Sequence, residues 1–406
     1  MKNRKASLAF IFTTVAVDMI GVGIIIPVIP ELIGNVAVVT LDEAAAIGGL
    51  MMMAFSGMQF FFAPITGELS DRFGRRPLLL FSLLALSADY LFHAFAPSIF
   101  WLFVGRILAG IAGASYTVAN AYIADISLAE NKAKNFGLVG AAFGIGFILG
   151  PVIGGVFGEL WGFRAPFIAS AALAFLNFLF GVFVLPESLP IEKRRKIDFK
   201  KMIPGVSLAN LVRYKSMGLF IGAFFLAFLA GQAMPSTWTF FTIEKLGWSE
   251  IDIGISLAFV GVLIALVQSV LVGWTTTKFG TERTIVGGYL MAAVGMALIS
   301  QSSETWHMYA FIIPYSLGGV ASPTLQGLLS NQVGEGEQGK LQGAITSLMS
   351  ITAIIGPLFH TQLFQAFSGA DAVFYFPGAP FAAAALLLSC SLALAVIALR
   401  RTDRIG

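Results

Sequence analysis

Long apolar runs separated by short polar breaks make up most of this sequence. Each run is about 20 residues long, the length that an α-helix needs to cross the roughly 30 Å hydrocarbon core of a bilayer. None alternates apolar and polar residues with a period of two, which disfavours a membrane β-barrel. The pattern predicts spans at about residues 7–30, 46–66, 77–96, 99–123, 135–157, 164–185, 216–241, 250–274, 284–303, 306–330, 340–365 and 377–400. We therefore expect an all-α membrane protein with twelve transmembrane helices.

Composition agrees with this fold class, and the placement of basic residues predicts an orientation. Hydrophobic residues make up 57% of the 406 residues and charged residues 12%, with a mean hydropathy of +0.85, far outside the range of soluble proteins. Most lysines and arginines fall in loops that share one side if the N-terminus is inside, including the run 193–196. Because cytoplasmic loops are enriched in Lys and Arg, we expect both termini in the cytoplasm, and a multi-pass protein of a bacterial inner membrane.

The two halves of the sequence repeat each other at an offset of 206 residues. Gly67 and Gly74 are matched by Gly273 and Gly280. Further matches are Gly113 with Gly319, Asp125 with Asn331, Gly137 with Gly343, and Gly150-Pro151 with Gly356-Pro357. Parallel repeats of six helices are typical of transporters in which one half rocks against the other around a midplane site. We expect two pseudo-symmetric six-helix bundles, 1–189 and 216–406, joined by a cytoplasmic linker at 190–215.

Motifs of enzymes are absent from the sequence. It contains no P-loop, which excludes ATP as the energy source, and no histidine or cysteine cluster that suggests a metal. The single cysteine, Cys390, excludes a disulfide framework. We therefore expect no catalytic residues, no metal and no cofactor, and we expect an ion gradient to supply the energy.

The stretch GELSDRFGRR, residues 67–76, places five charges in a short turn between the second and third spans. It resembles the loop 2-3 signature of the major facilitator superfamily, and GFILGPVIGG, residues 146–155, resembles the motif of its drug/proton antiporters. DMIGVGIIIPVIP, SADYLFHAF, GRILAGIAGA and EQGKLQGAITSLMSITAIIGPL are similar, in order and spacing, to the bacterial tetracycline/proton antiporters. The resemblance covers most of the chain.

The resemblance implies two gating elements. In the first, Asp71 faces the positive N-terminal end of the eleventh span and Arg75 pairs with Asp125, which latches the inner gate shut. This gating motif comprises Gly67, Asp71, Arg72, Gly74, Arg75, Arg76 and Asp125. The second is the antiporter motif of the fifth span, which seals or hinges the two halves and comprises Gly146, Gly150, Pro151, Gly154 and Gly155. The plainer alternatives are that the arginines only anchor topology and that the glycines only allow close packing.

Three ionisable residues lie well inside the predicted spans, where charge is costly and usually functional: Asp18, Asp89 and Arg106. Asp89 and Arg106 are nearly equidistant from the turn between the third and fourth spans, so we expect them at one depth and paired. Asp18 then has no basic partner and is our candidate for the proton-responsive site, because a carboxyl group in apolar surroundings favours its neutral form. The alternative pairs Arg106 with Asp18 and leaves Asp89 to titrate. His93 and His360 also lie in predicted spans and are interpreted as hydrogen-bonded packing residues, with a role as proton carriers as the alternative.

Few polar side chains are available to line a central cavity, which suits an amphiphilic organic substrate better than a sugar. The candidate substrate contacts are Phe55, Gln59, Asn120, Phe143, Gln232, Trp238, Gln268 and Gln326. Hydrogen bonding between helices is the alternative role for each polar member.

The sequence therefore favours a monomeric, proton-coupled exporter that works by rocker-switch alternating access, with a small amphiphilic substrate, protons and the bilayer as partners. The tetracycline branch usually carries a histidine in the eighth span and an acidic residue in the ninth. Ile264 and Ala293 stand at those positions here, so the sequence leaves the substrate, tetracycline included, and the proton stoichiometry open. The alternatives are a metabolite or siderophore transporter and, from another class, a lipid scramblase or membrane receptor.

Overall fold

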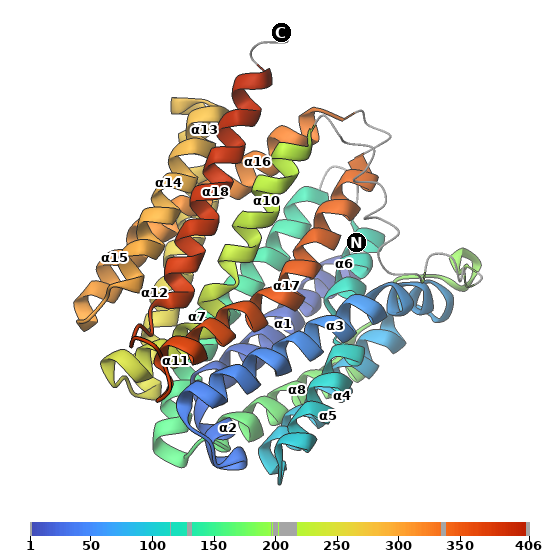
Figure 1. The fold of residues 1–406 in the computed structure, drawn as a ribbon. Helices are drawn as coiled ribbons and strands as arrows, with labels where there is room; N and C mark the ends of the chain where they lie inside the picture. Colours follow the sequence, from blue (N-terminus) through green and yellow to red (C-terminus); the bar gives the residue numbers. More distant parts are fainter. Residues whose placement is uncertain are drawn as a thin grey trace. The chain divides into compact units, whose positions relative to one another are not determined.

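The computed structural model describes residues 2–113, 115–127, 132–195, 197, 202, 217–333 and 338–402. Within this part of the chain every regular element is a helix (Figure 1). The chain divides into two compact units. The first unit contains Met1–Val39, Ala54–Pro204 and Trp248–Ala258, and the second contains Thr40–Met53, Gly205–Gly247 and Phe259–Gly406.

The first half of the chain forms long helices joined by short turns. These are α1 (Lys2–Ile25), the 3₁₀ turn η1 (Ile26–Val28), α2 (Ile29–Ala37), α3 (Leu41–Phe73), α4 (Arg75–Phe95), α5 (Ile99–Ala112), α6 (Ser115–Ile126), α7 (Lys132–Trp161), α8 (Ala165–Val184) and the 3₁₀ turn η3 (Ile191–Lys193).

The second half repeats this organisation. Its elements are α10 (Gly218–Gly231), α11 (Ala233–Leu246), α12 (Glu250–Leu266), the π-helical turn η5 (Val267–Leu271), α13 (Val272–Phe279), α14 (Thr281–Ser300), α15 (Thr305–Leu317), the 3₁₀ turn η6 (Gly318–Val320), α16 (Ala321–Asn331), α17 (Gln338–Ser368) and α18 (Ala379–Thr402).

The predicted spans correspond to helices in the described part of the chain. Ten helical segments there are long and apolar enough to cross a membrane. The two remaining predictions, 99–123 and 306–330, are each divided between two shorter helices, α5 with α6 and α15 with α16. Several helices extend beyond their apolar runs. For example, α3 covers 33 residues because polar residues continue the helix at both ends of the apolar stretch.

Helix breaks follow the internal repeat. The break after α5 at Gly113 and the 3₁₀ turn that contains Gly319 are related by the offset of 206 residues. The same offset relates Ile26, where η1 begins, to Gln232, where α10 gives way to α11. Glycine weakens a helix, and Pro27 removes a backbone donor, so the sequence gives local reasons for three of these four breaks. Discontinuous helices of this kind are found at transporter binding sites.

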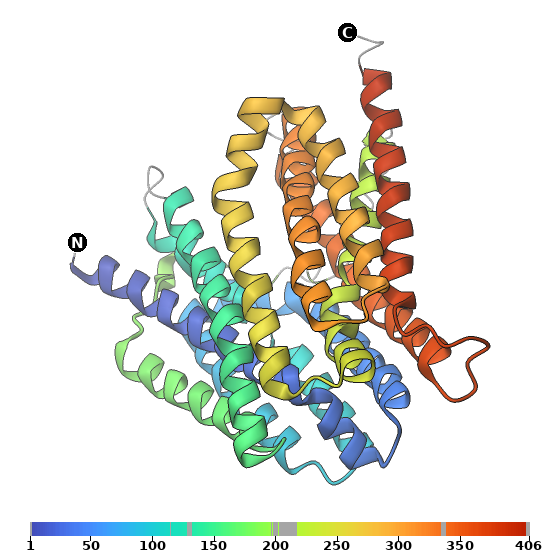
Figure 2. The ribbon, with the colours of Figure 1, turned by 90° about the vertical axis from the view of Figure 1, so that its left-hand side faces the viewer.

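The turns after α3 and α13 share an unusual backbone conformation. Gly74 has φ 108° and ψ 160°, and Gly280 has φ 81° and ψ 163°. A side chain would strain both positions, which explains the matching glycines in the sequence. The tight turn between α13 and α14 is visible in Figure 2. The repeat predicted from sequence is therefore present in the backbone.

The first unit has its core where α1 packs along α7 and α8. Buried side chains of α1, α4, α6 and α7 meet there in a cluster that includes Phe10, Ile11, Leu79, Tyr122 and Ala142. The start of α12 belongs to this unit, because Gly254 brings α12 against the Pro151 carbonyl of α7. In the second unit, α14 packs against α18 and α10 against α18. These cores hold the helices that carry the polar residues described below.

The predicted linker at 190–215 lies largely outside the described residues. Its described beginning, up to Arg195, follows α8 and returns to the turn between α3 and α4. There the Arg195 backbone N–H donates to the Asp71 carbonyl oxygen at 3.2 Å. The start of the linker is therefore fixed to the first unit.

Candidate functional site

Asp18 lies in the middle of α1 and is 6% exposed. Its carboxylate accepts one hydrogen bond, from the Asn177 Nδ2 of α8 at 3.3 Å. Asn177 is held in turn by Thr14, since its Nδ2 donates to the Thr14 carbonyl at 3.2 Å and its Oδ1 accepts from the Thr14 hydroxyl at 3.3 Å. In the described part of the first unit, no basic side chain forms an ion pair with Asp18. Such a buried, unpaired carboxyl group is suited to gain and lose a proton.

Asp89 forms the ion pair that the α4–α5 hairpin predicts. Its Oδ2 lies 2.7 Å from an Arg106 terminal nitrogen, and its side chain is almost fully buried. The alternative pairing of Arg106 with Asp18 is therefore not the one adopted. Because either charge alone would be costly to bury, Asp89 and Arg106 stabilise each other in the apolar interior.

His93 completes this cluster, which we call the Asp89 cluster (Asp89, His93 and Arg106). The Arg106 Nε–H donates to His93 Nε2 at 2.9 Å, so the ring carries its proton on Nδ1. That nitrogen donates to the Asp89 backbone carbonyl at 2.9 Å and lies 3.1 Å from the Asp89 Oδ1. His93 is therefore hydrogen-bonded on both ring nitrogens, as the sequence interpretation expects, and it bridges the two members of the ion pair.

Small residues let the Asp89 cluster form. A Cβ on Gly105 would lie 3.0 Å from His93 Nδ1 and 3.1 Å from Asp89 Oδ1, and closer still to the ring carbon between the two nitrogens. Arg106 also lies over the ring of Phe55, 5.6 Å from its centroid. Gly105 thus provides the space in which α5 approaches α4 at the depth of the ion pair.

At the turn between α3 and α4, Arg75 is the centre of a polar network. Its side chain contacts the Asp71 carboxylate at 2.5 Å, and its Nε donates to Asp125 Oδ2 at 3.1 Å. Ser188 also donates to Asp125, at 3.1 Å. The Arg75–Asp125 contact that the family resemblance implies is thus present. The contact of Asp71 with the N-terminal end of α17, and the roles of all these residues in gating, stay predictions.

Glu187 also belongs to this network, although nothing in the sequence pattern indicates it. Its carboxylate accepts from the backbone N–H groups of Arg75 at 2.9 Å and Arg76 at 3.3 Å, and therefore caps the N-terminus of α4. The carboxylate occupies the space where a Cβ of Gly74 would lie. Arg194 approaches Glu187 to 3.8 Å. Arg72 is exposed, and Gly67 has open space around it.

The antiporter motif on α7 packs against α1. A Cβ on Gly150 would lie 2.7 Å from Gly23 Cα and 2.7 Å from the Ile20 carbonyl. Gly146 and Gly154 lie against Met19 and Ile24 of α1, and Gly155 lies against Glu250. Pro151 stands within α7 without ending the helix. These glycines bring the two backbones together, which shows the packing role and leaves the sealing or hinge role as a prediction.

The candidate substrate contacts fall into different environments. Gln59 donates to the Gly113 carbonyl at 3.1 Å, which satisfies the acceptor freed by the break after α5. The Gln326 Nε2 donates to Gln342 Oε1 at 2.8 Å, and Gln232 packs against Gly356. Trp238 is buried, whereas Gln268 is exposed. The side chains of Asn120 and Phe143 lie outside what the structure describes. The contact role of these residues stays a prediction.

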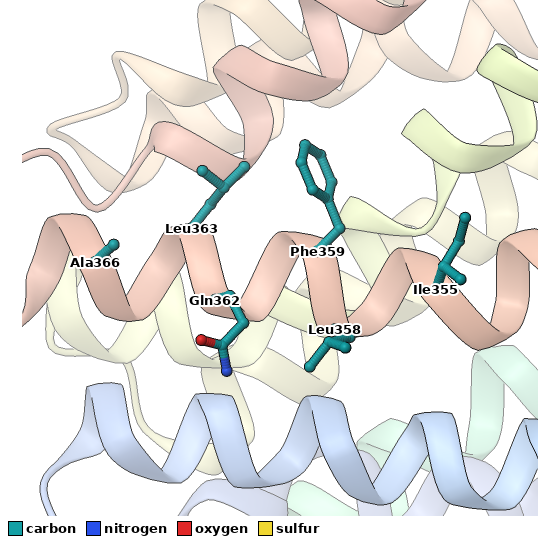
Figure 3. Close-up of a pocket in the computed structure, with 6 residues that line it drawn as sticks. All are labelled: Ile355, Leu358, Phe359, Gln362, Leu363 and Ala366. Atoms are coloured by element: carbon teal, nitrogen blue, oxygen red, sulfur yellow. The ribbon is translucent and has the colours of Figure 1, made fainter.

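A hollow of about 460 Å³ lies along α17 in the second unit. It is lined by Ile355, Leu358, Phe359, Gln362, Leu363 and Ala366, all from this one helix. Figure 3 shows Phe359 and Leu363 extending from one side of α17 and Leu358 and Gln362 from the other. None of the predicted substrate contacts lines it. Across the described residues, no group of three or more His, Cys, Asp or Glu side chains is placed to hold a metal ion.

Comparison with known proteins places these features in a family. The sequence model described as Major Facilitator Superfamily matches residues 11–274 and 219–403. The structure is similar to that of a bacterial homologue of the human lysosomal transporter Spinster, with a TM-score of 0.79 and 18% identity, covering 98% of this chain and 97% of the other. At that identity the likeness shows the fold.

Two relatives are more similar in sequence. The chain is 39% identical over 366 residues to the class C tetracycline resistance protein of Escherichia coli, covering 90% of this chain and 91% of the relative. It is 34% identical over 362 residues to the class H tetracycline resistance protein of Pasteurella multocida, covering 88% and 89%. The chain therefore belongs to the major facilitator superfamily and, within it, to the family of the tetracycline resistance proteins.

Proposed function

We propose that the protein is a secondary active transporter that exports an amphiphilic, drug-like compound in exchange for protons. The observation that carries this proposal is the contrast between two buried carboxylates of the first unit. Asp89 is neutralised by Arg106, whereas Asp18 has one amide donor and no cation. A carboxyl group of the second kind can bind a proton on one side of a membrane and release it on the other as access alternates.

The substrate class rests on the relatives and on the sparse polar groups. The relatives are tetracycline resistance proteins, so tetracycline-like molecules are the first compounds to test. Ala293 and Ile264 occupy the positions where the tetracycline branch usually has an acidic residue and a histidine. We therefore assign proton coupling to the first unit and leave the range of compounds broader than tetracycline.

The proposed setting is a bacterial inner membrane, with a monomeric chain and both termini in the cytoplasm. The distribution of basic residues supports this orientation, since Arg72, Arg75 and Arg76 precede or begin α4 on the same side as the linker. In this orientation the Arg75 network lies at the inner end of the first unit. Its opening and closing would then be part of rocker-switch alternating access.

Transport into proteoliposomes tests the proposal. Purified protein is reconstituted, a pH gradient is imposed, and uptake of tetracycline and a panel of amphiphilic cations is followed together with proton movement. If one monocation exchanges for one proton, the membrane potential cancels and the pH gradient alone concentrates the substrate, by about tenfold per pH unit. Substrate flux that ignores the pH gradient, or lipid movement without substrate flux, would contradict the proposal.

A further inference from the structure

Tyr90 carries a buried polar group that none of the interactions above uses. Its side chain is 1% exposed, and its hydroxyl has no hydrogen-bond partner among the described residues. A buried hydroxyl without a partner is uncommon, because it has lost its water and gained nothing in return. The position therefore needs an explanation.

The hydroxyl of Tyr90 faces α1 beside Asp18. It lies 3.3 Å from the point where a Cβ of Gly21 would stand. Gly21 follows Asp18 by three residues and so shares its face of α1. Tyr90 also interacts electrostatically with Asp18, Asp89 and Arg106. The tyrosine, which follows Asp89 directly on α4, thus brings its hydroxyl to the face of α1 that carries Asp18.

Asp18 lacks donors for its ionised form. An ionised carboxylate has two oxygens with about four acceptor sites, and Asn177 supplies one donor at 3.3 Å. A protonated carboxyl group needs fewer donors, so the observed surroundings suit the neutral form. Ionisation of Asp18 would therefore require a further donor close by.

We propose that Tyr90 is this second donor. While Asp18 carries a proton the tyrosine hydroxyl stays unpartnered, and when the proton leaves, the hydroxyl turns and donates to the carboxylate. Tyr90 keeps its own proton throughout and changes only its hydrogen bond. The one covalent bond that breaks is the Asp18 O–H bond, and its proton passes to water on the open side of the transporter. It is a positioning residue for proton release, and this role rests on the proposed function of Asp18.

A second acceptor lies in the same surroundings, because the Asp89 Oδ1 has no hydrogen-bond partner among the described residues. That oxygen lies 3.1 Å from His93 Nδ1, however, and Arg106 already neutralises its carboxylate. Apart from the basic residues at the starts of α1 and α4, the ionisable side chains described on the elements around Tyr90 are Asp18 on α1, Asp89 and His93 on α4, Arg106 on α5, and Tyr122 and Asp125 on α6. The α8 helix carries none, and those of α7 lie near its ends. Asp89 is paired with Arg106, Asp125 with Arg75, and the Tyr122 hydroxyl donates to the Pro186 carbonyl at 2.9 Å. Among these described carboxylates, Asp18 is therefore the one without a cation beside it, and the one that gains most from a further donor when it ionises.

Infrared difference spectroscopy of the purified full-length protein in lipid nanodiscs tests this proposal. The carboxylic C=O stretch that disappears in Asp18→Asn is assigned to Asp18, and its intensity is followed against pH. Tyr90→Phe keeps the ring but removes the donor, so Asp18 should hold its proton to higher pH. We expect a midpoint about one pH unit higher, which is a tenfold change in proton affinity.

Tyr289→Phe is the matched control. It removes an equally buried hydroxyl from α14 in the second unit, where the neighbours of the hydroxyl are the Ser322 and Ser391 side chains rather than a carboxylate. This control should leave the Asp18 midpoint unchanged. An unchanged or lowered midpoint in Tyr90→Phe, or an equal rise in Tyr289→Phe, would overturn the proposal.

Gly21→Ala provides a second variant if Tyr90→Phe does not fold. The added methyl group would stand 3.3 Å from the hydroxyl and 3.4 Å from a ring carbon, so the hydroxyl must shift by a few tenths of an ångström while the tyrosine itself is kept. The Asp18 midpoint should again rise, and an unchanged midpoint would overturn the proposal. The infrared measurement needs no transport. A protein that moves no protons with substrate yet shows these shifts would refute the proposed function and retain the role of Tyr90.

Discussion

The close approach of α1 and α7 makes Gly150→Ala a demanding substitution. The new Cβ would lie 2.7 Å from Gly23 Cα and from the Ile20 carbonyl oxygen, where ordinary contacts begin at 3.4 Å. Both neighbours are backbone atoms, so the helices must separate by several tenths of an ångström. Overpacking of this kind costs about 1–3 kcal/mol. At about 2–4 °C per kcal/mol for a unit of this size, a cost of about 2 kcal/mol lowers the Tm by about 4–8 °C.

Gly144→Ala on the same helix is the control, because a Cβ at Gly144 meets nothing within 4 Å. Both substitutions gain the same helix propensity, so the difference between them isolates the clash. Thermal unfolding of the two purified variants, followed by intrinsic tryptophan fluorescence in one detergent, measures it. Equal Tm values for the two variants would refute the packing that the structure shows between α1 and α7.

Three further predictions concern the polar networks of the first unit. Arg106→Met leaves the Asp89 carboxylate buried without a cation, so the free energy of unfolding in detergent should fall by about 3–5 kcal/mol, and adding Asp89→Asn should restore part of that loss. An Arg106→Met variant as stable as the parent would contradict the ion pair. Glu187→Ala removes the cap of α4, so the free energy of unfolding in detergent should fall by about 0.5–2 kcal/mol and amide hydrogen exchange should rise first at the start of α4. Unchanged exchange at the start of α4 would contradict the capping role. Arg75→Ala should weaken the inner gate and so change the ratio of inward-open to outward-open molecules, which distances between spin labels measure. An unchanged ratio together with unchanged transport would contradict the proposed latch.

Much of the fold follows from the sequence because membrane spans obey simple length and polarity rules. The Asp89–Arg106 pair could be predicted because the hairpin geometry places both residues at one depth, and each charge needs the other. The glycines of α7 could be predicted to face a neighbouring helix, although the pattern alone could not identify α1 as that neighbour. The repeat at an offset of 206 residues extends even to the backbone of Gly74 and Gly280.

Other parts of the site depend on contacts that a single sequence does not reveal. A lone histidine in an apolar helix indicates a hydrogen-bonded packing residue but carries no sign of its partners. The partners of His93 are Asp89 and Arg106, in the space left by Gly105. Asn177 supports Asp18 from 159 residues away, and Glu187 caps a helix that begins 112 residues before it. The break at Gly113 is stabilised by Gln59 from another helix, and with 44 glycines in the chain the glycine alone does not identify this position as a break.

Asp18→Asn tests proton coupling through Asp18 most directly, when pH-driven uptake and substrate counterflow are compared in the same proteoliposomes. Counterflow needs only substrate binding and alternating access, whereas accumulation driven by a pH gradient also needs a group that carries protons. The variant should lose pH-driven accumulation while counterflow continues at a rate comparable to the parent. Accumulation that still follows the pH gradient in Asp18→Asn would contradict the assignment of Asp18 as the coupling site.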